Sequence, residues 1–220
     1  SCPTAASMAR RGGSMPPCGM ADTDASLPLF PLHGVLVPGA ALDLRIFERR
    51  YLDMVGECGR KGSGFGVCLI LEGAEAGAPA TPVAFGTEAV IEDFGNTPEG
   101  LLSLRVRGRR RFHVLRTRVR DTGLVMADVE WRQDDASSPR LRPEHALLAE
   151  LLRRILLQVD AGLVDPDPAL FEEAAWVGWR LAEVLPLSMP QRQVLLQLDD
   201  PHARLQYLLD GIAGADADED

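Results

Sequence analysis

Apolar and polar residues alternate along much of the first half of the chain, with the two-residue period of half-buried β-strands. Leu42, Leu44 and Ile46, for example, alternate with charged residues. Residues 65–71 form a nearly continuous apolar run, which is typical of a strand covered on both faces. The pattern predicts about six strands, near residues 27–32, 42–46, 65–71, 83–94, 101–107 and 125–131.

The spacing of the apolar residues changes after the second of these strands. Phe47, Tyr51, Val55 and Cys58 follow one another at intervals of four, four and three residues. This spacing places their side chains on one face of a helix. A short helix is therefore expected between the second and third strands.

Proline and glycine residues predict three turns in this half. Pro38 and Gly39 fit a type II turn, because proline fixes φ at the first inner position and glycine accepts the positive φ of the second. Residues 96–100 have the composition of a hairpin turn, and Gly108 predicts a turn inside an arginine-rich segment. Six strands joined in this way favour a small closed or nearly closed barrel.

The second half of the chain has a helical period throughout. Apolar residues recur at intervals of three and four, and short polar connections favour antiparallel helices packed as a bundle. Asp167 before Pro168 predicts one helix start, and Ser188 with Gln191 forms the pattern of a capping box. About four helices are expected, near residues 143–159, 167–184, 188–198 and 200–212.

These elements divide the chain into segments. The first 26 residues are rich in small and polar residues, and residues 134–140 change the composition between the two halves. Residues 1–19 precede Met20, so they are either a native tail or sequence added before the natural start. The expected segments are a disordered tail at 1–26, a β subdomain at 27–133, a linker at 134–140, a helical subdomain at 141–213 and an acidic tail at 214–220.

Charge limits the expected partners. The formal net charge is −9 at pH 7; residues 27–133 carry 14 Lys and Arg against 13 Asp and Glu, whereas residues 141–213 carry 6 against 11. An acidic chain is a poor general binder of nucleic acid, because phosphate neutralisation dominates that affinity. No apolar run reaches the about 20 residues of a membrane span, and no secretory signal is recognisable. We therefore expect a cytoplasmic protein without membrane contact.

Catalytic and metal-binding patterns are weak. Lys61 is the only lysine, and its Gly-Arg-Lys-Gly-Ser-Gly segment lacks the spacing of a phosphate-binding P-loop. The histidines lack the spacing of a zinc site, and the cysteines form no CxxC pair, which favours reduced thiols. No nucleophile with an activating partner is apparent. We expect no enzymatic activity, no metal and no cofactor.

An arginine-rich segment lies between residues 105 and 120, and it has two interpretations. In the first, Arg105, Arg107, Arg109, Arg110 and Arg111 form a surface for anions or RNA. In the second, arginine fills the solvent face of a strand whose other face is buried. The second is favoured, because no aromatic residues are interleaved among the arginines to stack bases.

The order of several segments resembles the LON domain, the amino-terminal substrate-binding region of ATP-dependent Lon proteases, which also occurs as a stand-alone bacterial protein. The resemblance covers about residues 27–213. It implies an α+β fold, with an amino-terminal PUA-like pseudo-barrel of about six strands and one short helix, followed by a bundle of about four helices. The segments that carry it are residues 27–51, 65–69, 85–87, 104–112, 185–187, Gln193 and 199–201.

The resemblance also implies a function. It indicates a non-enzymatic module that binds unfolded polypeptide segments or a partner protein, including a separate protease. The P-loop ATPase and the Ser-Lys protease dyad of Lon belong to other domains, and neither motif is found here. Because LON domains are similar to RNA-binding PUA folds, RNA binding by the arginine-rich strands is the alternative.

Polypeptide binding predicts a particular kind of surface. An apolar groove between the β half and the helices, or an uncovered sheet edge, would capture an unfolded chain through side-chain pockets and backbone pairing. Aromatic residues are common anchors of such surfaces. The candidate anchors are Phe30, Phe47, Tyr51, Phe94, Trp131 and Trp176.

Overall fold

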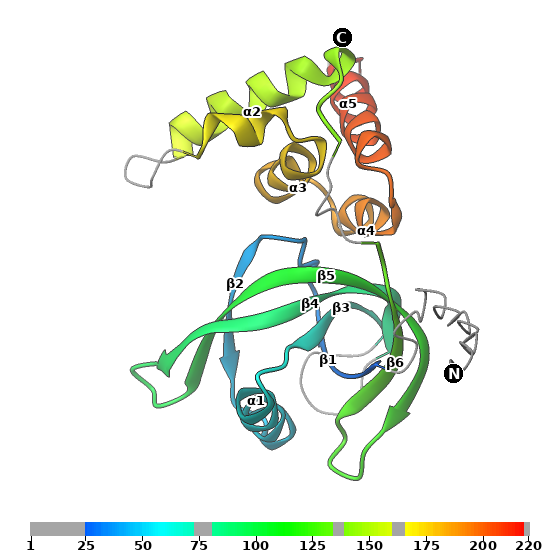
Figure 1. Cartoon of the computed structure of the whole chain (residues 1–220). Helices are drawn as coiled ribbons and strands as arrows, with labels where there is room; N and C mark the ends of the chain where they lie inside the picture. The colour runs from blue at the N-terminus through cyan, green and yellow to red at the C-terminus, as the bar shows by residue number, and fades with distance from the viewer. Residues whose placement is uncertain (1–24, 73–80, 134–138, 160–165, 218–220) are drawn as a thin grey trace, which may run out of the picture.

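The computed structural model of the chain describes residues 25–72, 81–133, 139–159 and 166–217. A barrel-like β half is followed by a helical half, and one helix, α1, lies at the end of the barrel away from the other helices (Figure 1). The α+β fold with six strands is confirmed. The tail predicted over residues 1–26 and the linker over 134–140 fall largely outside the described residues.

The six strands form one mixed sheet with the order β2-β5-β4-β3-β1-β6. An additional pairing between β5 and β6 closes five of the strands into a ring and leaves β2 attached to β5 alone. The ring explains why the apolar faces of the strands are buried. The strands are β1 (Ala25–Leu32), β2 (Ala41–Ile46), β3 (Phe65–Glu72), β4 (Thr81–Asn96), β5 (Leu102–Val119) and β6 (Val125–Trp131).

The predicted turn at Gly108 is wrong, because β5 continues through this residue. Gly108 instead permits a close approach of the loop between β1 and β2. A Cβ atom at this position would lie 2.4 Å from the carbonyl oxygen of Val37, and the Gly108 N–H donates to the carbonyl of Ala40 at 2.9 Å. The turn predicted at Pro38–Gly39 is confirmed, since Gly39 has a φ of 79° and the Ala40 N–H donates to the Val37 carbonyl at 3.1 Å.

The predicted short helix is α1 (Arg49–Lys61), but the prediction of its buried face is only partly right. Tyr51 and Cys58 are buried, together with Arg50 and Met54. Phe47 is not part of the helix, which begins after Glu48, and its side chain is 59% exposed. The helix therefore begins too late for Phe47 to share its buried face.

The helical half contains the expected starts and one unexpected break. Asp167 accepts a hydrogen bond from the Ala169 N–H, and Ser188 with Gln191 forms a complete capping box. The helix predicted over 167–184 is divided, because Glu173 has an extended backbone. The elements are η2 (Pro143–His145), α2 (Ala146–Val159), η3 (Pro168–Glu172), α3 (Ala174–Val184), α4 (Met189–Gln197) and α5 (Pro201–Ala217).

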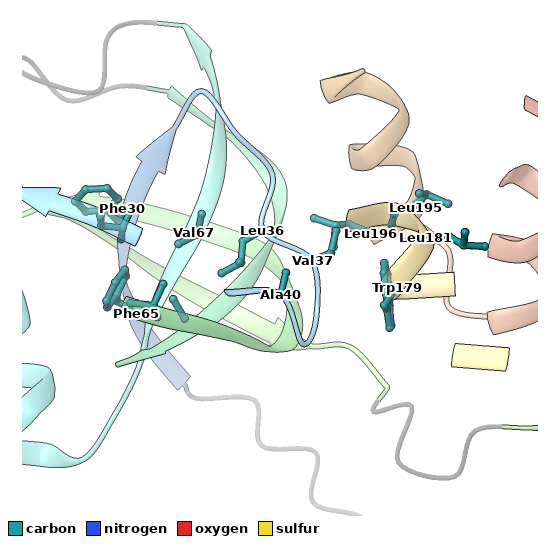
Figure 2. Packing of buried hydrophobic residues seen from close by; sticks show 14 of the residues in the cluster. Phe30, Leu36, Val37, Ala40, Phe65, Val67, Trp179, Leu181, Leu195 and Leu196 are labelled. Atoms are coloured by element: carbon teal, nitrogen blue, oxygen red, sulfur yellow. The ribbon is translucent and has the colours of Figure 1, made fainter. Parts of the chain in front are cut away.

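One apolar core extends through both halves. Val37 and Ala40, in the loop between β1 and β2, belong to the same cluster of buried side chains as Trp179 of α3 and Leu196 of α4. Figure 2 shows this loop lying between the barrel interior and the helices. Because burial of apolar side chains is the main favourable contribution to folding, the shared core holds the two halves against each other.

Candidate functional site

An open groove of about 460 Å³ lies between the end of β1 and the length of β2. We call it the β2 groove. Phe30, Leu32, His33 and Gly34 line one side, residues 42–48 line the other, and Tyr51 of α1 completes the wall. The groove thus brings together three of the six aromatic residues predicted to bind polypeptide, Phe30, Phe47 and Tyr51.

The three aromatic residues differ in how much of each a ligand can reach. Phe30 and Tyr51 are buried and pack on each other, with ring centroids 4.4 Å apart. Their contacts fix the floor of the groove. Phe47 is 59% exposed, so it is the aromatic side chain that a bound molecule would cover.

The other three predicted aromatic residues lie elsewhere. Phe94 is 74% exposed and lines a separate apolar groove of about 500 Å³ between α1 and strands β4 and β5. Trp131 is half-buried beneath the guanidinium of Arg110, which lies 3.8 Å from the ring centroid. Trp176 is half-buried and packs edge-on against Phe171. The six residues therefore do not form a single surface.

A third cavity, of about 450 Å³, lies between the β half and the helices. Trp176 lines it, together with Arg107, Arg109, Arg110 and Arg111, four of the five arginines of the predicted anion surface. Most of these arginines have acidic partners, and Arg109 alone of the five forms no ion pair within the described residues. The pairs are Arg105 with Asp43, Arg107 with Glu92, Arg110 with Glu88 and Arg111 with Asp199.

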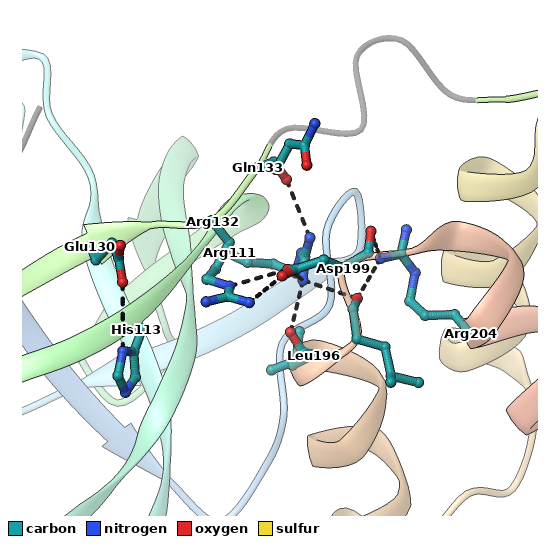
Figure 3. A network of polar contacts seen from close by, with 9 residues as sticks. Arg111, His113, Glu130, Arg132, Gln133, Leu196, Asp199 and Arg204 are labelled. Carbon is teal, nitrogen blue, oxygen red and sulfur yellow. Dashed lines mark hydrogen bonds and ion pairs between the residues drawn. The ribbon is translucent and has the colours of Figure 1, made fainter. Parts of the chain in front are cut away.

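Arg111 does not lie on a solvent-exposed face, although it continues the arginine-rich segment. Its side chain is buried and donates hydrogen bonds to the carbonyl oxygens of Leu196, Leu198 and Gln133, at 2.9, 3.2 and 3.2 Å. A fourth bond, of 3.1 Å, goes to the carboxylate of Asp199 (Figure 3). Arg111 therefore joins β5 to the segment between α4 and α5.

The ion pairs also set the charge state of exposed carboxylates. Hydrogen bonds from Arg107 hold the pKa of Glu92 below its ordinary value, and hydrogen bonds from Arg116 and Arg118 do the same for Asp128. These carboxylates remain charged beside their arginines. The arginine-rich strand consequently presents a mixed surface of both signs, with less free positive charge than the sequence alone suggests.

The two thiols that the structure describes, Cys58 and Cys68, are buried. Burial raises the pKa of Cys68 to about 12, and burial also raises the pKa of Cys58. A thiol with a raised pKa forms little of the thiolate that acts as a nucleophile. In the part of the chain that the structure describes, no three His, Cys, Asp or Glu side chains gather as a metal site would need.

Sequence reasoning missed the residues that surround Phe47 in the β2 groove. Leu42, Leu44 and Ile46 were recognised as one face of a strand, but no local signal shows that this strand ends the sheet. Leu32 ends the first predicted strand, and His33 and Gly34 carry no pattern of their own. They line the groove only because β1 lies opposite β2 in the folded chain.

None of the helices within the described ranges is long and apolar enough to cross a membrane.

Comparisons with known proteins agree with the fold. The sequence-family model of the ATP-dependent protease La (LON) substrate-binding domain matches residues 26–213. A Lon N-terminal domain protein from Xanthomonas campestris, known from its crystal structure, has 56% sequence identity to this chain. The two structures match with a TM-score of 0.73 over 84% of this chain and 98% of that one. The N-terminal domain of a Mycobacterium avium complex Lon protease has a TM-score of 0.60 at 16% identity, over 84% of this chain and 97% of that one. No curated protein matches the chain.

Proposed function

Since the chain belongs to the family of LON substrate-binding domains, we propose that it binds unfolded polypeptide segments and that the β2 groove holds them. The observation that carries this proposal is the exposed side chain of Phe47 beside the apolar wall of the groove. Polypeptide clients or a partner protein are the expected ligands.

The groove has the size and lining that such a function requires. Its volume of about 460 Å³ falls within the range of about 300–1,000 Å³ that is typical of binding pockets. Covering a large apolar side chain such as Phe47 contributes about 1.5–3 kcal/mol. Folded proteins keep most of their large apolar side chains inside, so a groove of this kind selects unfolded segments.

In this proposal the chain supplies binding and not catalysis. The family is named for substrate binding, and both described thiols have a pKa raised by burial. We propose that any breakdown of a bound polypeptide is carried out by a separate protease. A cytoplasmic location is the compartment we expect for this role.

Replacing Phe47 tests the proposal. Phe47→Ala removes an exposed anchor, so we expect binding to reduced and carboxymethylated lactalbumin, a permanently unfolded protein, to weaken by about 1–3 kcal/mol. Affinity would be measured by fluorescence anisotropy, with a urea denaturation curve for each variant. Phe94→Ala is the matched control, because Phe94 is also exposed but lines a different groove. Unchanged affinity in Phe47→Ala would contradict the location.

RNA binding is the alternative function, favoured by the arginines that line the cavity beside Trp176. The ion pairs weigh against it, because an arginine already held by a carboxylate must exchange that partner to bind phosphate. Replacing Arg109 and Arg110 with glutamine separates the two functions. RNA affinity that falls steeply with salt, and that falls in this variant, would support the alternative. Binding of unfolded protein should remain at the wild-type level.

A further inference from the structure

We propose that the bound polypeptide is an extended segment that joins the sheet as an additional strand along the free edge of β2. This inference rests on the proposed function and specifies the conformation of the ligand. Hydrogen bonds between backbones would then hold the ligand, and side chains would select it.

The β2 groove follows the edge of the strand and not one of its faces. Successive side chains of a strand point to opposite faces. The groove is nevertheless lined by every residue from 42 to 48 in succession. Only the edge of the strand, where the backbone itself is accessible, borders all of these residues at once.

The edge of β2 that borders the groove has no strand pairing within the described residues. Within the described ranges, β2 pairs with β5 alone, through six consecutive pairs of residues from Ala41 to Ile46. The N–H and C=O groups that point away from β5 therefore have no strand beside them. An unpaired row of donors and acceptors is a template for another strand.

The edge of β2 also lacks two of the usual protections against such pairing. Edge strands are commonly protected by proline or by β-bulges. Residues Ala41–Ile46 contain no proline, and their register with β5 has no irregularity. Across the groove, β1 contains Pro28 and Pro31, which have no N–H to donate. We therefore assign β2, and not β1, as the strand that pairs with the ligand.

The side chains of β2 specify the pattern that fits. Leu44 and Ile46 are buried on the inner face, and Leu42 is half-buried on the same face. Neighbouring strands place directly opposite side chains in contact, so the ligand should have apolar residues at alternate positions. Arg45 is exposed and forms no ion pair with any described residue, so an acidic residue on the outer face would complement it.

Hydrogen exchange tests the strand pairing. Amide exchange in residues 41–46 would be followed by mass spectrometry with and without carboxymethylated lactalbumin. At a ligand concentration of about 100 times Kd, exchange of the amides that point away from β5 should slow by up to about 100-fold. Binding without protection of these amides would overturn the strand pairing and leave the proposed function standing. No binding at all would overturn the proposed function.

A substitution that fills the groove provides a second test. A Cβ atom at Gly34 would meet no atom within 4 Å, and the backbone there does not need glycine. Gly34→Phe should therefore fold normally and lower the affinity by about tenfold or more through steric conflict with the ligand. Gly211→Phe is the control, because it also adds a side chain to open space, on α5. Equal affinities in the two variants would contradict the site.

The same exchange experiment distinguishes a second copy of the chain as the occupant. If two chains pair through β2, the amides of residues 41–46 are protected without ligand, and the protection rises with protein concentration. Sedimentation velocity would then detect a dimer. That result would overturn the assignment of an unfolded polypeptide as the partner of this edge.

Discussion

Arg111 is only 4% exposed, and its guanidinium group donates to three carbonyl oxygens and one carboxylate. Replacing it with methionine keeps much of the volume but removes all four hydrogen bonds. The carbonyl oxygens of Leu196 and Gln133 would then lose the Arg111 donor, whereas Asp199 would keep its ion pair with Arg132 and the Leu198 carbonyl its hydrogen bond from Arg204. We expect Arg111→Met to lower the free energy of unfolding by about 1–3 kcal/mol, measured by urea denaturation.

Arg109 provides the control for this prediction. It lies two residues away, is exposed, and forms no ion pair with a described residue. Arg109→Gln should change the free energy of unfolding by no more than about 0.5 kcal/mol. Similar losses in both variants would show that the burial of Arg111 has no special effect.

His145 and His202 form a second buried polar group, where η2 meets the start of α5. Their rings stack with centroids 5.8 Å apart, and the Nδ1 atom of each has no hydrogen-bond partner within the described residues. Burial and the charge of Arg142 lower the pKa of His202, against the opposite effect of Asp200 and a smaller one of Glu144. The folded chain thus favours the neutral form of His202.

The lowered pKa predicts how stability depends on pH. Between the folded pKa of His202 and its ordinary value of 6.5, the unfolded chain binds more protons than the folded chain. Stability should therefore be lost as the pH falls below about 6.5 and be retained above it. Urea denaturation at several pH values would measure this, and His202→Gln should show a flatter profile. A wild-type profile that rises toward low pH would contradict the prediction.

At the scale of elements, β5 organises the β half. Residues 102–107 of β5 pair with β2, residues 102–113 pair with β4, and residues 112–119 pair with β6. One strand of 18 residues thereby takes part in the closed ring and also pairs with β2, the strand that has the free edge. The loop between β1 and β2 lies against this strand at Gly108.

The close contact at Gly108 predicts that adding a single methyl group at this position lowers the free energy of unfolding. In Gly108→Ala, the added Cβ would meet the Val37 carbonyl at 2.4 Å, so the loop or the strand must move. We expect a loss of about 1–3 kcal/mol in the free energy of unfolding. Gly95→Ala is the control, since its Cβ would make an ordinary contact at 3.5 Å with Ser103. Equal stability of the two variants would mean that the loop adjusts freely.

At the scale of the whole molecule, the two halves share an apolar core and the hydrogen bonds of Arg111. Loss of either half would expose apolar surface of the other, so we expect them to unfold together. Protection of the buried thiols of Cys58 and Cys68 against alkylation, which reports on the β half, and far-ultraviolet circular dichroism, which reports mainly on the helices, should give the same urea midpoint. Two separate midpoints would indicate that the shared core contributes little.

The helical half and the closed ring leave one end of the sheet open for binding. The helical half lies at the end of the barrel away from α1, with α3 and α4 nearest to the strands, and β2 is the strand at the edge of the sheet (Figure 1). No described segment covers the β2 groove, while Arg111 and its partners lie at the interface between the halves. This arrangement separates the stability of the molecule from its proposed binding site.

The sequence by itself determined the strands, the order of the helices, the turn at Gly39 and the capping box at Ser188. These features depend on interactions within a few residues: the period of apolar side chains, the dihedral preferences of proline and glycine, and hydrogen bonds at the start of a helix. The resemblance to the LON domain had the same basis, because it consisted of such local segments in order.

The tertiary structure alone decided which residues can meet a ligand. Arg109 and Arg111 are the same residue type on one strand, yet Arg111 is buried and bonded to the segment after α4, whereas Arg109 is exposed. The helical spacing predicts Phe47 on one face of a helix, and Phe47 is exposed because the helix begins after it. The free edge of β2 depends on the pairings of all six strands. Burial and pairing arise from segments distant in sequence, so no local pattern contains them.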